Sequence, residues 1–307
     1  MQYQNMTDAI GNTPLIRLGN IEKAYNLKAK LYAKVEALNP AGSAKDRAVM
    51  GMIRQAVIEG KLKPGATLIE PTSGNTGIAM AAIAANMGYK AVIVMPDSMS
   101  VERIKLMKVY GAEVILTPGK EGMSGSIKKA EELCANTENS MILGQFDNKA
   151  NAREHYRTTG PEIYRDLGGK ISAFIAGVGT GGTFTGVSAF LKECIDDVKC
   201  IAVEPAASPM LSEGKFGAHK IQGIGANFVP GNYNGEFCDE IITVPDEKAL
   251  EMFRLLPRKE GIFAGISSGA ALAAAIEVGQ RKEYEAKNIV VVFTDTGDRY
   301  LSVVSNE

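Results

Sequence analysis

The chain of 307 residues has no tryptophan, only four cysteines and only two histidines. No two cysteines form a CxxC pair, and their irregular spacing does not fit a disulfide framework. His155 and His219 stand far apart and outside any HExxH pattern, so a zinc site is not expected. The sequence therefore supports neither a disulfide framework nor a bound metal.

The sequence also lacks an excess of charge of either sign and any long apolar run. It has 34 Lys and Arg against 35 Asp and Glu, a formal net charge of −1, which gives no support to a surface for nucleic acid or anionic membrane. No stretch reaches the roughly 20 apolar residues of a membrane-spanning helix, and the N-terminus lacks the pattern of a secretion signal. We therefore expect a cytoplasmic protein that binds neither nucleic acid nor membrane.

What the sequence does contain is short apolar runs that alternate with helical patterns. This alternation predicts an α/β fold with two packed lobes, each a mostly parallel twisted sheet flanked by helices. We place the lobes at residues 1–148 and 149–307, with part of 10–36 able to cross to the second lobe. Glycines that follow helices, such as Gly88, predict left-handed helix ends. The predicted strands are 30–35, 67–70, 91–95, 113–116, 171–176, 200–203, 240–244 and 289–293, and the predicted helices are 45–59, 76–86, 101–109, 124–134, 150–166, 183–192, 247–256 and 267–285.

Glycine-rich turns precede three of these helices, where free backbone N–H groups and the helix dipole favour an anion. Pro71–Gly77 (PTSGNTG) is rich in hydroxyls and could surround a carboxylate, although Ser73 or Asn75 could act as an ordinary N-cap. Gly177–Thr183 (GVGTGGT) follows an apolar strand and suits a phosphate. It also partly matches a dinucleotide fingerprint, with Glu204 near the place of a ribose-binding acid. A nicotinamide-dependent dehydrogenase is therefore an alternative.

A third turn and one lysine complete the set. Gly265–Ala271 (GISSGAA) begins a predicted helix of small residues. The simpler interpretation of its serines is that they only cap this helix. Lys45 lies in Asn39–Arg47 (NPAGSAKDR) at the start of a predicted helix, where the dipole opposes its charge. We expect the pKa of Lys45 to fall and its free amine to form a Schiff base, although a solvated lysine in a polar turn is the simpler interpretation. Together these features match an amino-acid enzyme that uses pyridoxal 5′-phosphate.

Five motifs in order resemble the cysteine synthase (O-acetylserine sulfhydrylase) family, pyridoxal phosphate enzymes of the tryptophan-synthase-β-like group. The segments 145–163 (QFDNKANAREHYRTTGPEI) and 223–230 (GIGANFVP) are also similar to that family, and the similarity runs from about Thr7 to Ser302. The resemblance implies a cofactor in the cleft between two lobes. The five motifs are NPAGSAKDR (39–47), PTSGNTG (71–77), GTGGT (179–183), GISSGAA (265–271) and GDRYL (297–301).

The resemblance also implies a role for each matching residue. Lys45 would hold the cofactor as a Schiff base and then remove the Cα proton of the substrate. Asn75 would bond the ring oxygen of the cofactor, and Ser267 would face its pyridine nitrogen. The cofactor phosphate would be held by Gly179, Thr180, Gly181, Gly182 and Thr183. The substrate carboxylate would be held by Thr72, Ser73, Thr76 and Gln145.

A neutral serine opposite the pyridine nitrogen makes the ring a weaker electron sink than a carboxylate would. This favours β-elimination and β-replacement through an α-aminoacrylate over transamination or racemisation. The family's reaction makes L-cysteine from O-acetylserine and sulfide. Members that consume cysteine release hydrogen sulfide and add water or a thiol, giving serine or lanthionine, and water needs a general base. Both directions stay open.

The match is loosest at Val229–Cys238 (VPGNYNGEFC), near the side from which the second substrate attacks. Asn232 is therefore a candidate on the nucleophile side, with a solvated loop of no catalytic role as the alternative. The resemblance further implies a homodimer that binds an amino-acid substrate and sulfide, with the tail of a serine acetyltransferase as a candidate partner. A degenerate member that binds without turnover is disfavoured because Lys45, Asn75 and Ser267 are all present.

Overall fold

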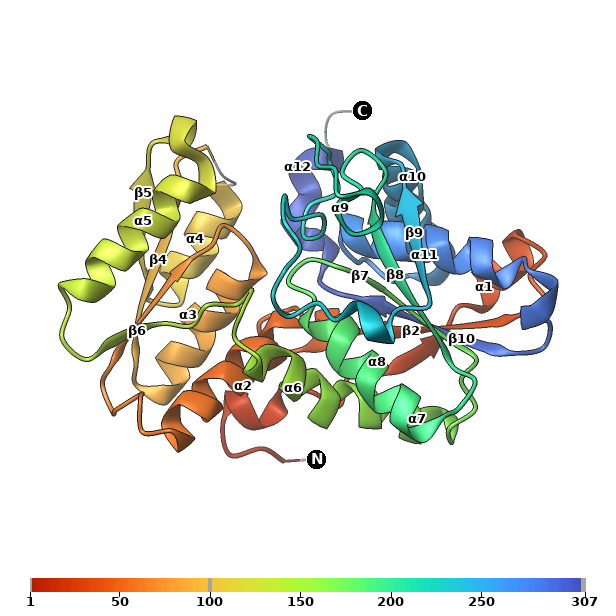
Figure 1. The fold of residues 1–307 in the computed structure, drawn as a ribbon, viewed down its shortest axis with the longest axis horizontal. Coiled ribbons are helices and arrows are strands. Elements are labelled where there is room, and N and C mark those ends of the chain that lie inside the picture. Colours follow the sequence, from red (N-terminus) through yellow and green to blue (C-terminus); the bar gives the residue numbers. More distant parts are fainter. Residues whose placement is uncertain (1, 99–100, 305–307) are drawn as a thin grey trace. The chain divides into compact units, whose positions relative to one another are not determined.

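The computed structural model describes residues 2–98 and 101–304, and their contacts form two compact units (Figure 1). Unit 1 lies within Met1–Ile10 and Asn39–Asn151, and unit 2 within Gly11–Leu38 and Ala152–Glu307. Each unit contains one sheet covered by helices, so the predicted α/β fold class is confirmed. The division into lobes 1–148 and 149–307, with the functional role given to each lobe, stays a prediction.

Unit 1 is built on a four-stranded parallel sheet in the order β5-β4-β3-β6. Leu68, Ile93 and Met95 pack on one face, in the same cluster as α3, whereas Ile69 and Val94 pack with α5 on the other. Burial of both faces is what a parallel sheet requires. The strands are β3 (Thr67–Pro71), β4 (Lys90–Pro96), β5 (Glu113–Thr117) and β6 (Ser140–Ile142), and the helices are α2 (Lys45–Ile58), α3 (Asn75–Met87), α4 (Val101–Val109) and α5 (Gly122–Ala135).

Unit 2 is built on a six-stranded sheet in the order β1-β2-β10-β7-β8-β9, in which only β1 runs antiparallel. Its strands are β1 (Leu15–Arg17), β2 (Lys30–Val35), β7 (Ala173–Gly177), β8 (Lys199–Pro205), β9 (Glu240–Val244) and β10 (Asn288–Phe293). Its helices are α1 (Gly19–Ala24), α6 (Ala150–Arg157, entered from unit 1), α7 (Thr159–Leu167), α8 (Gly182–Cys194), α9 (Met210–Glu213), α10 (Asp246–Glu260), α11 (Ile266–Gly279) and α12 (Leu301–Val304).

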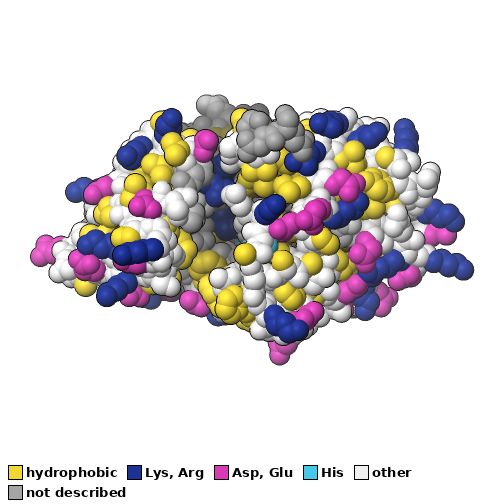
Figure 2. Space-filling model, turned by 90° about the horizontal axis from the view of Figure 1, so that it is seen from above, with side chains coloured by type: hydrophobic (Ala, Val, Ile, Leu, Met, Phe, Trp, Pro, Cys, Tyr) yellow, Lys and Arg dark blue, Asp and Glu magenta, His cyan; other side chains and the backbone are white. Residues whose placement is uncertain are grey.

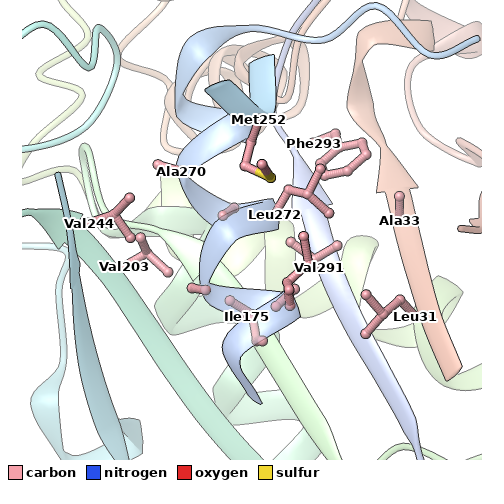
Figure 3. Close-up of a cluster of buried hydrophobic side chains, with 14 of the residues drawn as sticks. Leu31, Ala33, Ile175, Val203, Val244, Met252, Ala270, Leu272, Val291 and Phe293 are labelled. Carbon is pink, nitrogen blue, oxygen red and sulfur yellow. The ribbon is translucent and has the colours of Figure 1, made fainter. Parts of the chain in front are cut away.

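The core of unit 2 surrounds α11. Ile175, Val203 and Val291 point from neighbouring strands toward this helix, as Figure 3 shows. The intervening residues, such as Phe174, point to the opposite face and pack with α8. A Cβ added to Gly269 of α11 would lie 2.3 Å from the carbonyl oxygen of Ala249 in α10, so the two helices are in backbone contact. This packing fixes the N-terminus of α11.

The structure corrects the predicted helices at two places. The predicted helix 150–166 is two helices, α6 and α7, which are separated at Thr158. The reason is Pro161, which has no N–H and whose ring excludes a helical bond to residue 157, where α6 ends. The predicted helix 267–285 ends at Gly279. Gly88 ends α3 with a φ of 74°, as predicted.

Two global features bear on the functional class. None of the helices in the described ranges has both the length and the apolar character needed to cross a bilayer. Among the same residues, no cluster of three or more His, Cys, Asp and Glu side chains could hold a metal ion. On the face seen in Figure 2, basic and acidic side chains are interspersed over the surface.

Candidate active site

Lys45 is the first residue of α2, where the sequence predicted it. The preceding turn is closed by Asp46, whose buried carboxylate accepts a hydrogen bond of 2.6 Å from the backbone N–H of Ala41. The hydroxyl of Ser43 accepts from the backbone N–H of Lys45 at 3.2 Å. Gly42 has a φ of 81°, a conformation that favours glycine. The motif therefore folds back on itself and fixes a half-buried Lys45 at the helix N-terminus.

The segment 71–77 turns from β3 into α3. The hydroxyl of Thr72 accepts from the N–H of Gly74 at 3.2 Å. Gly74 is the N-cap of α3, so neither Ser73 nor Asn75 occupies that position, and no cap side chain competes for the first N–H groups of the helix. This segment therefore keeps its hydroxyls and its helix N-terminus for an anion.

The segment 71–77 also contacts Gln145, which lies far along the chain. The hydroxyl of Thr76 donates to the Gln145 side-chain oxygen at 2.5 Å. The side-chain amide of Asn151 donates to the Gln145 carbonyl at 2.9 Å. Two of the four residues predicted to bind a carboxylate, Thr76 and Gln145, are thus in direct contact, and both are buried.

Glu70 supports this arrangement and was not predicted from sequence. It is 1% exposed, and its two carboxylate oxygens accept from the N–H groups of Gly144 at 3.0 Å and Gln145 at 3.2 Å. Burial raises the pKa of Glu70 from 4.5 to about 7, against the lowering effect of these backbone bonds. Glu70 therefore anchors the turn that presents Gln145. Its only sequence signal is an acidic residue at the end of an apolar strand.

In unit 2, the turn between β7 and α8 is a backbone cradle. A Cβ on Gly179 would lie 2.3 Å from the carbonyl oxygen of Gly223, and one on Gly181 would lie 2.6 Å from the backbone nitrogen of Tyr233. Gly181 is the N-cap of α8 and has a φ of 83°. Neither Gly179 nor Gly181 has room for a side chain, and the segment 179–183 leads into the N-terminus of a 13-residue helix, so these residues fit a phosphate.

His155 contacts the end of this cradle and was not among the predicted site residues. Its Nε2 lies 3.1 Å from the hydroxyl oxygen of Thr183, and its Nδ1 lies 2.9 Å from that of Thr159. The ring is buried, with 1% of the residue exposed. From the sequence, His155 is only one residue of the predicted helix 150–166, and no local pattern indicates a role in the site.

Ser267 lies in the first turn of α11 and is buried. A Cβ built on Gly223 would lie 3.6 Å from its hydroxyl oxygen, so Gly223 lies close to both Ser267 and Gly179. Beneath the helix start, the hydroxyl of Tyr300 donates to Asp295 at 2.6 Å, and a Cβ on Gly265 would meet that same carboxylate at 2.1 Å. The segments 179–183, 223–230, 265–271 and 297–301 therefore converge within unit 2.

The structure bears on two alternatives from the sequence. Asn232 is 2% exposed, so its side chain is buried, although Val229, Gly231 and Glu236 in the same segment are exposed. Tyr233 packs on Phe184 of α8, with ring centroids 5.7 Å apart. Glu204 is buried, and its carboxylate accepts from the N–H groups of Leu211 at 2.7 Å and Ser212 at 3.0 Å. The acid expected to bind a ribose in a dehydrogenase instead holds α9.

Comparisons with known proteins agree with this geometry. The family model described as pyridoxal-phosphate dependent enzyme matches residues 6–295. The chain is similar to the probable cysteine synthase of Bacillus subtilis, with 52% identity over 97% of this chain and 96% of that protein. It is similar to the cysteine synthase of Staphylococcus aureus, with 50% identity over 97% and 95% of the two chains.

Among solved structures, a hydrogen sulfide-producing enzyme from Fusobacterium nucleatum is similar, with a TM-score of 0.94 and 45% identity, covering 98% of both chains. The motifs that resembled cysteine synthases, the backbone cradle at 179–183 and identity of about half over nearly the full length point to one family. The chain belongs to the cysteine synthase family of pyridoxal-phosphate-dependent enzymes.

Proposed function

We propose that this enzyme catalyses β-replacement on a three-carbon amino acid, in which sulfide replaces the acetate of O-acetylserine to give L-cysteine and free acetate. The observation that carries the proposal is the buried hydroxyl of Ser267, next to Gly223 and the cradle 179–183. Because a neutral hydroxyl does not keep the pyridine nitrogen protonated, the cofactor is a weaker electron sink. Loss of a β leaving group is then favoured over transamination or racemisation.

Each predicted cofactor residue has a proposed task. Pyridoxal phosphate, when bound, withdraws electrons from the substrate Cα. Lys45 holds the cofactor and takes the Cα proton at its Nζ atom. Asn75 bonds the ring oxygen, and Ser267 bonds the pyridine nitrogen. Gly179, Thr180, Gly181, Gly182 and Thr183 hold the phosphate through backbone N–H groups, hydroxyls and the N-terminus of α8.

The substrate carboxylate is proposed to bind at the segment 71–77. Thr72 and Ser73 supply hydroxyl donors around the N-terminus of α3, where the helix dipole favours an anion. The hydroxyl proton of Thr76 is already donated to Gln145, so Thr76 can offer its backbone N–H at the helix start. Gln145 supplies an amide, and its side-chain oxygen already accepts from Thr76. The side-chain N–H₂ of Gln145 can therefore donate to the substrate.

Absorbance spectroscopy tests the cofactor and the lysine together. The purified enzyme should be yellow, should lose its visible band with hydroxylamine, and should regain it with pyridoxal phosphate. Lys45→Ala should abolish turnover and the lysine-dependent band, whereas Lys61→Ala, at an exposed lysine, should change neither. A colourless wild-type enzyme that gains no band on reconstitution would refute the proposal.

A second candidate reaction is release of hydrogen sulfide from L-cysteine, since a similar solved structure is that of a hydrogen sulfide-producing enzyme. Sulfide is already a strong nucleophile, but water needs a base, and the buried amide of Asn232 does not accept a proton at neutral pH. Sulfide addition is therefore favoured over water addition in this chain. L-Cysteine given alone should shift the cofactor band only slightly and release little sulfide.

Asn232→Asp tests the residue that separates the two reactions. If Asn232 faces the incoming nucleophile, the new carboxylate should change the rate of sulfide release from L-cysteine. The exposed Asn136→Asp is a matched control that should leave the rate unchanged. An equal rate in the Asn232→Asp variant would remove this residue from the site.

Assembly and location form part of the same proposal. We propose a cytoplasmic homodimer that binds the C-terminal tail of a serine acetyltransferase. Light scattering after gel filtration should give twice the chain mass of 32.7 kDa. A synthetic tail peptide should compete with O-acetylserine for the enzyme, and a scrambled peptide should not.

A further inference from the structure

The imidazole of His155 lies within hydrogen-bonding distance of two hydroxyls, one of which belongs to the proposed phosphate site. Thr183, in the first turn of α8, lies 3.1 Å from Nε2, and Thr159, the first residue of α7, lies 2.9 Å from Nδ1. Both nitrogens of the buried ring are therefore engaged by groups that can donate or accept.

The position of the ring is fixed by close packing of α6 on α8. A Cβ on Gly186 of α8 would lie 2.1 Å from the carbonyl oxygen of Ala152 and 2.8 Å from the Cβ of His155. Gly186 comes three residues after Thr183, so this contact holds His155 beside the last residue of the cradle. This contact fixes the backbone of α6, and with it the Cβ of His155, against α8.

The hydrogen bonds allow two arrangements in a neutral imidazole. If Nε2 carries the proton, it donates to Thr183, and Nδ1 accepts from Thr159. The hydroxyl proton of Thr183 is then directed away from the ring. If Nδ1 carries the proton, Thr183 must donate to Nε2 and has no proton left for another acceptor. A phosphate in the cradle selects the first arrangement, because a phosphate oxygen only accepts.

We propose that His155 is a positioning residue that holds the Thr183 hydroxyl as a donor to the cofactor phosphate. The proposal rests on the proposed function, which assigns the cradle 179–183 to that phosphate. His155 itself does not touch the cofactor. It acts through Thr183, and Thr159 is the donor to Nδ1 in the arrangement that the phosphate selects.

The test compares two ligands of the full-length apoenzyme, pyridoxal phosphate and pyridoxal, which lacks the phosphate. His155→Leu should weaken pyridoxal phosphate about tenfold, the scale of one hydrogen bond to a charged group, and leave pyridoxal within about twofold. His155→Gln, which can place an amide N–H near Nε2, should recover most of the loss. The phosphorus NMR resonance of the bound cofactor should shift in the leucine variant and return in the glutamine variant.

Controls separate this role from a general structural one. Tyr156→Phe, on the same helix, should change neither affinity. Thr183→Val should match His155→Leu, and the double variant should be no weaker than Thr183→Val alone. Equal weakening of both ligands in His155→Leu and His155→Gln, or no weakening in either variant, would overturn the proposal. A wild-type enzyme that does not prefer pyridoxal phosphate over pyridoxal would instead refute the phosphate assignment, and the inference with it.

Discussion

Glu70 makes the stability of this enzyme depend on pH near neutrality. Burial raises its pKa from 4.5 to about 7, although the N–H groups of Gln145, Gly144 and Leu143 oppose the rise. Between these values the folded chain binds more protons than the unfolded chain, so the free energy of unfolding decreases as pH increases through this window. At about 1.4 kcal/mol per pKa unit, Glu70 makes the fold less stable at pH 8 than at pH 4 by about 3 kcal/mol.

Glu70→Gln should remove this pH dependence, because an amide does not titrate. At acidic pH, where Glu70 is a neutral carboxylic acid, the variant should be less stable by about 1 kcal/mol, since the amide has one acceptor oxygen for the two N–H groups of Gly144 and Gln145 that meet separate oxygens of Glu70. With increasing pH the variant should approach and then exceed the wild type. Urea unfolding of the apoenzyme from pH 5 to 8.5 measures the difference.

Two further observations make the Glu70 prediction refutable. Glu131→Gln, at an exposed position in α5, should keep the wild-type pH dependence. In protein labelled with ¹³C at glutamate carboxyls, the resonance that is missing in Glu70→Gln should titrate near pH 7. A resonance that titrates near pH 4.5, or a constant stability difference between Glu70→Gln and wild type across the pH range, would show that burial does not dominate at Glu70.

Two other predictions concern unit 2. Gly181→Ala should cost about 2–4 kcal/mol and weaken pyridoxal phosphate binding, because its Cβ would lie 2.6 Å from the nitrogen of Tyr233 at a φ of 83°. Gly214→Ala, at a φ of 68° with nothing within 4 Å, should cost only about 1 kcal/mol in urea unfolding. Lys34→Met should cost about 3–5 kcal/mol because it leaves a buried carboxylate 2.8 Å away without its cation. Lys28→Met, at an exposed pair, should cost no more than about 1 kcal/mol.

The sequence predicted the cradle and the helix starts because their chemistry is local. Glycines and hydroxyls between an apolar run and a helical run indicate an anion site without knowledge of any distant residue. Lys45, Thr76, Gly181 and Ser267 each lie at or near a helix N-terminus, as predicted. Their roles stay predictions until the experiments above are done.

Residues that act through others were missed. Glu70 and His155 have no local signal, because their importance depends on partners that the fold brings to them, Gln145 and Thr183. The strands β1 and β6 were also missed, since three residues are too few for a periodic pattern. The break at Thr158 was predictable, because Pro161 excludes a continuous helix across that position.

The order of strands in unit 2 has a consequence for synthesis of the chain. β2 pairs with β1 on one side and with β10 on the other, and β10 lies near the opposite end of the sequence. On the ribosome, residues 39–151 of unit 1 emerge long before β10. The edge of β2 that pairs with β10 therefore stays without a partner strand until residues 288–293 have been synthesised. Translation that stops before β10 should leave the backbone N–H and C=O groups at this edge of β2 unpaired and able to associate with other chains.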